Sequence, residues 1–150
     1  MEQKYLSDDV FKQIKDFDND YKKFGLCKEC KQPFTNYYWC QSCNAKHFQE
    51  NFKNWTSGNS DVDKLIQESQ LNAKNEDEKL EWIEYNRFEN IEYVAKGGFG
   101  TIYKAIWKDG MIFNWDCETD QWKRNSIYVA LKYLNNSKDI TLEFLNEVIF

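Results

Sequence analysis

Four of the five cysteines form two closely spaced pairs. Cys27 and Cys30 enclose two residues, Cys40 and Cys43 enclose two more, and nine residues separate the pairs. Two CxxC turns can place four thiolates around one Zn²⁺ ion in a tetrahedron. Such a site has no open coordination position, so the spacing predicts a structural zinc ion. Four free or redox-active cysteines without a metal are the alternative interpretation.

The single histidine and the fifth cysteine are weaker candidates for metal binding or catalysis. His47 is the only histidine and could replace a thiolate as a zinc ligand, but we expect an ordinary packing or surface residue. Cys117 stands alone in the sequence, which is typical of a bystander thiol.

A second group of residues suits phosphate binding. Residues 94–102 read VAKGGFGTI, and glycines let backbone N–H groups approach phosphate oxygens closely. A dinucleotide-binding loop leads into a helix, whereas the following TIYKAIW is β-branched and aromatic and predicts a strand. Lys132 in the run VALK falls on a further predicted strand. It could neutralise phosphates, or it could be a solvated strand lysine.

In combination, these motifs make residues 88–150 resemble the N-terminal lobe of the eukaryotic protein-kinase family. Within that family, the run GGFGTIYKA is most similar to tyrosine kinases. The cysteine pairs, the WTSGN segment and the long insertion before VALK also resemble a large group of fungal kinase-like proteins. The resemblance implies ATP as a cofactor. It implies that the nucleotide contacts are Val94, Ala95, Lys96, Gly97, Gly98, Phe99, Gly100, Thr101, Ile102, Ala130, Lys132 and Glu147.

The resemblance also implies a role for each of these residues. Val94, Ile102 and Ala130 would surround the adenine, the glycine run would lie over the phosphates, and Lys132 would hold them. Ala95 stands where the family has its first loop glycine, and a β-carbon is tolerated there if φ stays negative.

Active kinases pair the strand lysine with a glutamate on the next helix. Glu143 and Glu147 share one face of a helix predicted near the end of the chain. The run FLNEV resembles the family pattern, so we expect Glu147 rather than Glu143 to be the partner. Two solvated carboxylates are the alternative.

The catalytic motifs of the family, HRD, DFG and APE, do not occur in these 150 residues. We therefore assign no catalytic residue and expect the chain alone to be inactive. The expected function is the ATP-binding part of a kinase that transfers the γ-phosphate of ATP to protein hydroxyls, with magnesium, in a longer parent. The sequence ends inside the helix predicted near Glu143 and Glu147, and a truncated gene model or partial product would explain that end point. The alternative is a metal-stabilised interaction module or a pseudokinase-like fragment without catalysis.

Positioning these motifs requires an α+β fold. We expect four segments: an N-terminal helical segment at 1–24, a zinc-ribbon-like unit at 25–58, a helix and linker at 59–87, and a partial kinase N-lobe at 88–150. Ser60 with Asp63 predicts a capping box, and residues 72–79 are the linker candidate. The insertion at 108–126 predicts a small hairpin before the third strand.

Net charge and hydropathy bear on which classes of partner the chain can bind. A net charge of −5 argues against a general nucleic-acid binder, and the sequence has no run of 18 apolar residues that would predict a transmembrane helix. The acidic N-terminus is unlike a signal peptide, so we expect a cytoplasmic protein. The protein substrate and the preference for Ser/Thr or Tyr are not determined by the sequence.

Overall fold

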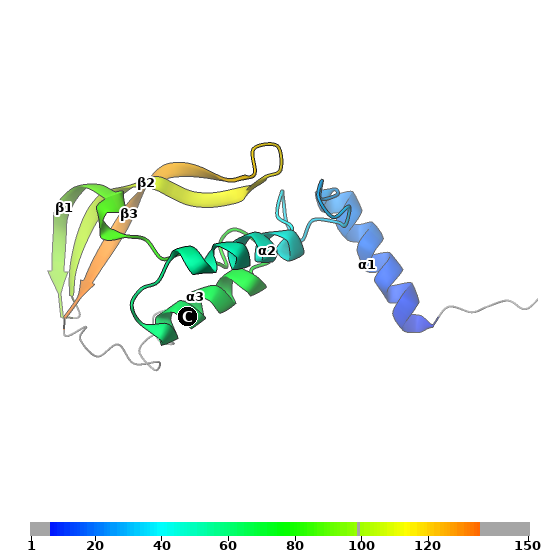
Figure 1. Cartoon of the computed structure of the whole chain (residues 1–150), viewed down its shortest axis with the longest axis horizontal. Helices are drawn as coiled ribbons and strands as arrows, with labels where there is room; N and C mark the ends of the chain where they lie inside the picture. The colour runs from blue at the N-terminus through cyan, green and yellow to red at the C-terminus, as the bar shows by residue number, and fades with distance from the viewer. Residues whose placement is uncertain (1–6, 99, 136–150) are drawn as a thin grey trace, which may run out of the picture.

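The computed structural model describes residues 7–98 and 100–135. In this part of the chain three antiparallel strands form one sheet in the order β1-β2-β3, and three α-helices precede it (Figure 1). This arrangement confirms the predicted α+β class. The elements are α1 (Asp8–Phe24), α2 (Gln41–Asn51), η1 (Phe52–Asn54), α3 (Ser60–Asn72), η2 (Tyr85–Arg87), β1 (Phe88–Gly97), β2 (Gly100–Asp116) and β3 (Gln121–Leu134).

The insertion at 108–126 forms a hairpin, as predicted, and this hairpin is continuous with the pairing of β2 and β3. Strands β2 and β3 stay paired from Gly100 opposite Leu134 to Asp116 opposite Gln121, with register shifts along the way. Gly110 allows one of these shifts, since its φ is 70° and a β-carbon there would lie 1.4 Å from the carbonyl oxygen of Asn125. The far end of this long ribbon extends over α2 (Figure 1).

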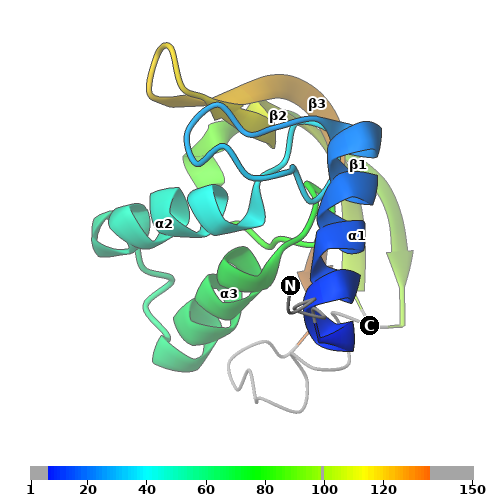
Figure 2. The same ribbon diagram turned by 90° about the vertical axis from the view of Figure 1, so that its right-hand side faces the viewer.

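One hydrophobic core joins the cysteine-rich unit to the sheet. Trp39, Phe48, Ala73 and Ile112 form a buried cluster, and Trp122 packs against it. The cluster therefore takes residues from the segment before α2, from α2, from the end of α3 and from the sheet. Figure 2 shows α2 and α3 side by side on one side of the molecule.

Helix α3 begins where the sequence predicts a helix, but its cap differs from the expected Ser60–Asp63 capping box. Asn59 is the N-cap, and its side-chain oxygen accepts from the backbone N–H groups of Asp61 at 2.9 Å and Val62 at 3.2 Å. Asp63 instead accepts from the backbone N–H of Ser57 at 2.7 Å. Asparagine caps a helix as well as serine does, so the local pattern allowed either residue.

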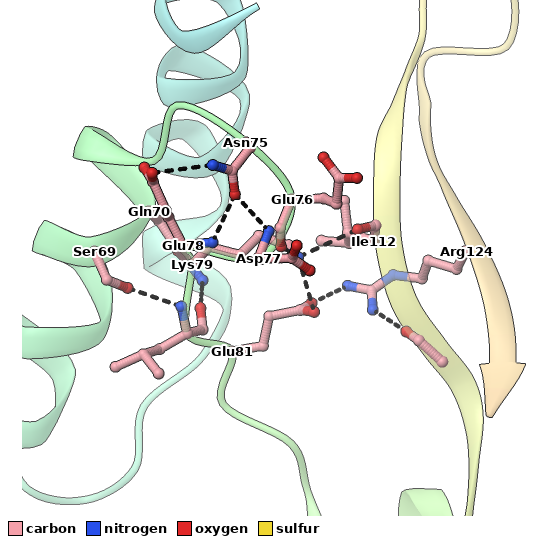
Figure 3. A network of polar contacts seen from close by, with 12 residues as sticks. Ser69, Gln70, Asn75, Glu76, Asp77, Glu78, Lys79, Glu81, Ile112 and Arg124 are labelled. Carbon is pink, nitrogen blue, oxygen red and sulfur yellow. Dashed lines mark hydrogen bonds and ion pairs between the residues drawn. The ribbon is translucent and has the colours of Figure 1, made fainter. Parts of the chain in front are cut away.

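The predicted linker at 72–79 is an ordered turn that is fixed to the sheet by Lys79 (Figure 3). The side chain of Lys79 is 2% exposed, and its ammonium donates to the carbonyl oxygens of Glu76 at 2.8 Å and Ile112 at 3.2 Å. Glu81 lies 4.0 Å from this ammonium and 2.7 Å from the guanidinium of Arg124. Burial lowers the pKa of Lys79, and the charge of Glu81 opposes that shift.

Helix α3 also holds this segment. The side-chain amide of Gln70 donates to the carbonyl of Leu80 at 2.8 Å, and the hydroxyl of Ser69 accepts from the N–H of Leu80 at 2.9 Å. Side chains of α3 thus satisfy the backbone groups of Leu80, next to the predicted linker, and the side chain of Lys79 satisfies a carbonyl of the sheet. None of the helices in residues 7–98 and 100–135 has the length and apolar character needed to cross a membrane.

We expect Lys79→Met to lower the free energy of unfolding by about 2–4 kcal/mol, because the change leaves the carbonyl groups of Glu76 and Ile112 without their hydrogen-bond donor, whereas Glu81 keeps its contact with Arg124. Urea denaturation followed by tryptophan fluorescence would measure the difference. Lys74→Met is the matched control, since Lys74 lies in the same turn and is exposed. Equal stability of the two variants would contradict the role given to Lys79.

Candidate metal centre and phosphate-binding face

The four paired cysteines converge on one point. The Sγ atoms of Cys27, Cys30, Cys40 and Cys43 all lie within 4.8 Å of one another, and all four are free thiols. Sγ of Cys27 is 3.9 Å from Sγ of Cys43, and Sγ of Cys30 is 3.6 Å from Sγ of Cys40. A zinc ion with Zn–S bonds of about 2.3 Å in a tetrahedron separates its sulfurs by about 3.8 Å. The cluster could therefore hold one metal ion, as its spacing predicts.

The two cysteine pairs are positioned in different ways. The first lies on a tight loop, in which the N–H of Cys27 donates to the carbonyl of Gln32 at 2.8 Å and the N–H of Lys31 to the carbonyl of Cys27 at 3.0 Å. The second begins a helix, because Cys40 is the N-cap of α2 and Cys43 lies in its first turn. Residues three apart share a face in a helical turn, so CxxC spacing fits this geometry too. A helix thus takes the place of the second turn of a zinc ribbon.

Two of the thiols, those of Cys27 and Cys43, lie in a setting that disfavours their negatively charged form. Burial raises the pKa of Cys27 to about 11 and also raises the pKa of Cys43. Burial acts in the same direction on Cys30, but hydrogen bonds from the backbone of Gln32 and from the thiol of Cys40 outweigh it and lower the pKa of Cys30. A divalent cation would offset the cost of gathering several thiolates here.

His47 is a packing residue, as expected, and lies outside the sulfur cluster. Its ring stacks on Trp115 with centroids 3.7 Å apart, and Nε2 lies 3.0 Å from a carboxylate oxygen of Glu29. Trp122 stacks on Phe48 at 4.4 Å in the same region. These contacts attach the tip of the β2–β3 ribbon to α2. The sequence signal for them was weak: two tryptophans on either side of a polar turn.

A cavity of about 530 Å³ separates the first cysteine loop from the tip of the ribbon. Phe34, Asn44 and Cys117 are among its lining residues. An ion pair between Lys28 and Glu118, 3.5 Å apart, joins the loop to the ribbon tip. Cys117 therefore lines the same cavity as the first cysteine loop, although the four-sulfur cluster does not include it.

The second candidate site lies on the sheet. Lys132 pairs with Ile102 across β2 and β3, Ala130 pairs with Lys104, and Ile102 also pairs with Ala95 of β1. Side chains alternate between the two faces of a strand, and directly paired residues share a face. Ile102, Ala130 and Lys132 therefore lie on the same face of the sheet.

The glycine run forms the turn at the end of this face. Gly97 pairs with Gly100, Lys96 pairs with Thr101, and Gly98 lies in the turn between the strands. Val94 lies at a register shift on β1 and is 57% exposed. Phe99 and Glu147 fall outside the described residues, so the expected pairing of Lys132 with Glu147 stays a prediction.

Gly98 and Gly100 are glycines for different reasons. Gly100 has a φ of 158°, and a β-carbon there would lie 2.0 Å from the carbonyl oxygen of Tyr133 on β3. No atom lies within 4 Å of the position that a β-carbon would take at Gly98. Gly100 thus serves the pairing of the strands, whereas Gly98 leaves open space above the backbone, where a ligand could approach.

Comparison of the chain with protein families, with curated proteins and with solved structures gave no match.

For the metal centre, we expect the purified chain to carry about one zinc ion per molecule. Cys43→Ser should abolish stoichiometric zinc binding and loosen α2, because metal-binding energy contributes to local folding. Cys117→Ser is the control and should keep its zinc. Elemental analysis combined with circular dichroism would test this, and a zinc-free, fully folded wild-type chain would contradict it.

For the glycine turn, Gly100→Ala should destabilise the sheet by about 1–3 kcal/mol, since the new methyl group would overlap a strand carbonyl. Gly98→Ala should leave the free energy of unfolding nearly unchanged. Thermal unfolding of the two variants side by side would measure the difference. The prediction fails if Gly98→Ala proves the more damaging change.

Proposed function

We propose that this chain supplies the ATP-binding part of a protein kinase that, in a longer parent, transfers the γ-phosphate of ATP to protein hydroxyls. The observation that carries the proposal is the shared face of Ile102, Ala130 and Lys132, next to the Gly97–Gly100 turn. Apolar side chains and the cation of Lys132 on a single sheet face, beside glycine backbone, match the chemistry of a nucleotide, and Lys104, which pairs with Ala130, adds a second cation to this face.

Each part of ATP would meet a suitable group. Ile102, Val94 and Ala130 offer an apolar surface to the adenine, and the backbone of the glycine turn offers N–H groups to phosphate oxygens. Lys132 lies on a strand that is paired with β2, which fixes the position of its backbone near the glycine turn. In the family that the sequence resembles, magnesium and the catalytic aspartates come from motifs absent from these 150 residues.

The metal centre would then have a structural role, with zinc as the ion. A site with four sulfur ligands has no open position for a substrate. It would hold α2, and α2 in turn packs against Trp122 near the tip of the β2–β3 ribbon. Thiolates that stay reduced suit a cytoplasmic location, which we also propose.

One observation favours a second candidate, a metal-stabilised interaction module without catalysis. The cavity of about 530 Å³ lies against the metal unit, whereas the sheet face offers an open surface. An open sheet face is nevertheless what the kinase function predicts for this chain. The nucleotide cleft of a kinase lies between two lobes, and the sheet alone would form only one wall of that cleft, so we favour the kinase function.

Titration of the isotope-labelled chain with MgATP would test the proposal by NMR. We expect the backbone signals of Gly97, Gly98, Ile102 and Lys132 to shift, and those of the cysteine unit to stay unchanged. Lys132→Met should remove the shifts at the glycine turn while those at Ile102 and Ala130 persist, because adenine contacts do not require the cation.

Lys123→Met is the matched control, since Lys123 lies on the same strand near its other end. The absence of any shift at the glycine turn would favour the interaction module. Sequencing of the transcript beyond codon 150 would separate the two functions further, because the kinase proposal requires HRD and DFG motifs downstream.

A further inference from the structure

Helix α1 presents an apolar stripe with no partner among the described residues. Val10, Ile14, Phe17 and Tyr21 are 38%, 55%, 44% and 48% exposed, and no residue of α1 is buried. Figure 1 shows the helix projecting away from α2, α3 and the sheet. Its C-terminal end is anchored, because the ring of Phe24 packs edge-to-face on Tyr37 with centroids 5.2 Å apart.

The stripe has the spacing of a coiled-coil seam. Val10, Ile14, Phe17 and Tyr21 follow one another at intervals of four, three and four residues, and Phe24 continues the series after three. Alternating steps of three and four keep apolar side chains on the line where two helices meet. A surface helix packed against a globular core usually has an apolar face that is wider along its whole length, whereas only Phe11, which is 65% exposed, widens the stripe here. A second helix is therefore the form of partner that this stripe fits.

The charges of α1 indicate that the partner helix is a second α1 and that the two helices run in opposite directions. Asp8 and Asp9 lie in its first turn, and Lys22 and Lys23 lie in its last turn. A parallel second copy would bring like charges together at both ends. An antiparallel second copy would bring the acidic end of each helix beside the basic end of the other, and the two helix dipoles would also oppose each other favourably.

We propose that two copies of this chain associate through antiparallel pairing of their α1 helices. In this register Ile14 lies level with Phe17 of the second copy, and Val10 lies level with Tyr21 of the second copy. Asp18 and Asp20, which border the stripe, then lie beside Phe11 and Gln13 of the second copy, so no like charges face each other. The association depends on α1 alone and is independent of nucleotide or metal binding.

Sedimentation velocity of the full zinc-loaded chain would test the pairing over about 1 to 100 µM. We expect the apparent mass to rise from 18.1 kDa toward twice that value as the concentration increases. Ile14→Asp with Phe17→Asp should keep the chain monomeric. The matched control, Lys12→Ala with Asn19→Ala on the opposite side of the helix, should still dimerise. A wild-type chain that stays monomeric throughout overturns the proposal.

Two charge-reversed variants test the antiparallel direction: Asp8→Lys with Asp9→Lys, and Lys22→Asp with Lys23→Asp. Each alone would place like charges at both ends of the pair, so its dimer dissociation constant should rise at least about tenfold. An equimolar mixture restores opposite charges at both ends and should associate nearly as well as wild type. If each variant alone dimerises like wild type, or if the mixture is no stronger than either variant, antiparallel α1 pairing is wrong.

Discussion

Burial of Trp39 is the constraint on which the rest of the structure depends. Its side chain is fully buried, and its indole N–H donates to the carbonyl of Ala73 at 2.9 Å. Its ring packs near Phe48 of α2 and Trp122 of β3. One side chain therefore joins the cysteine-rich unit, the end of α3 and the sheet. A large aromatic ring contributes more buried area than any other residue in so small a core, and its single donor is satisfied.

The position of Trp39 in the chain couples this core to the sulfur cluster. It directly precedes Cys40, which caps α2 and contributes one of the four clustered sulfurs. A change at the sulfur cluster must therefore reach the start of α2 and, through it, the aromatic cluster. The core is modest, so an ion held by four thiolates would be a substantial share of what keeps α2 in place.

The β2–β3 ribbon connects the two candidate sites. At one end its strands carry Ile102 and Lys132 beside the glycine turn, and at the other end Trp115 and Trp122 pack against α2 and His47. Paired strands are stiff along their length because each residue is held by its neighbours across the ladder. Lys79 adds a buried polar attachment to the middle of the ribbon through the carbonyl of Ile112. The candidate phosphate-binding face is thus connected to the cysteine-rich unit through the paired strands β2 and β3.

The sequence by itself determined the features that depend on near neighbours. CxxC spacing predicted the sulfur cluster, and the alternation around the glycine run predicted the first two strands, because turns and alternating faces are properties of a few consecutive residues. Only the tertiary structure decided that the 108–126 insertion prolongs β2 and β3, that Lys79 is buried in a turn with a polar sequence, and that His47 stacks on Trp115. The burial of Lys79 and the stacking of His47 depend on contacts between residues tens of positions apart in the sequence. A local pattern shows which face of an element is apolar, but the partner of that face is chosen by packing of the whole chain.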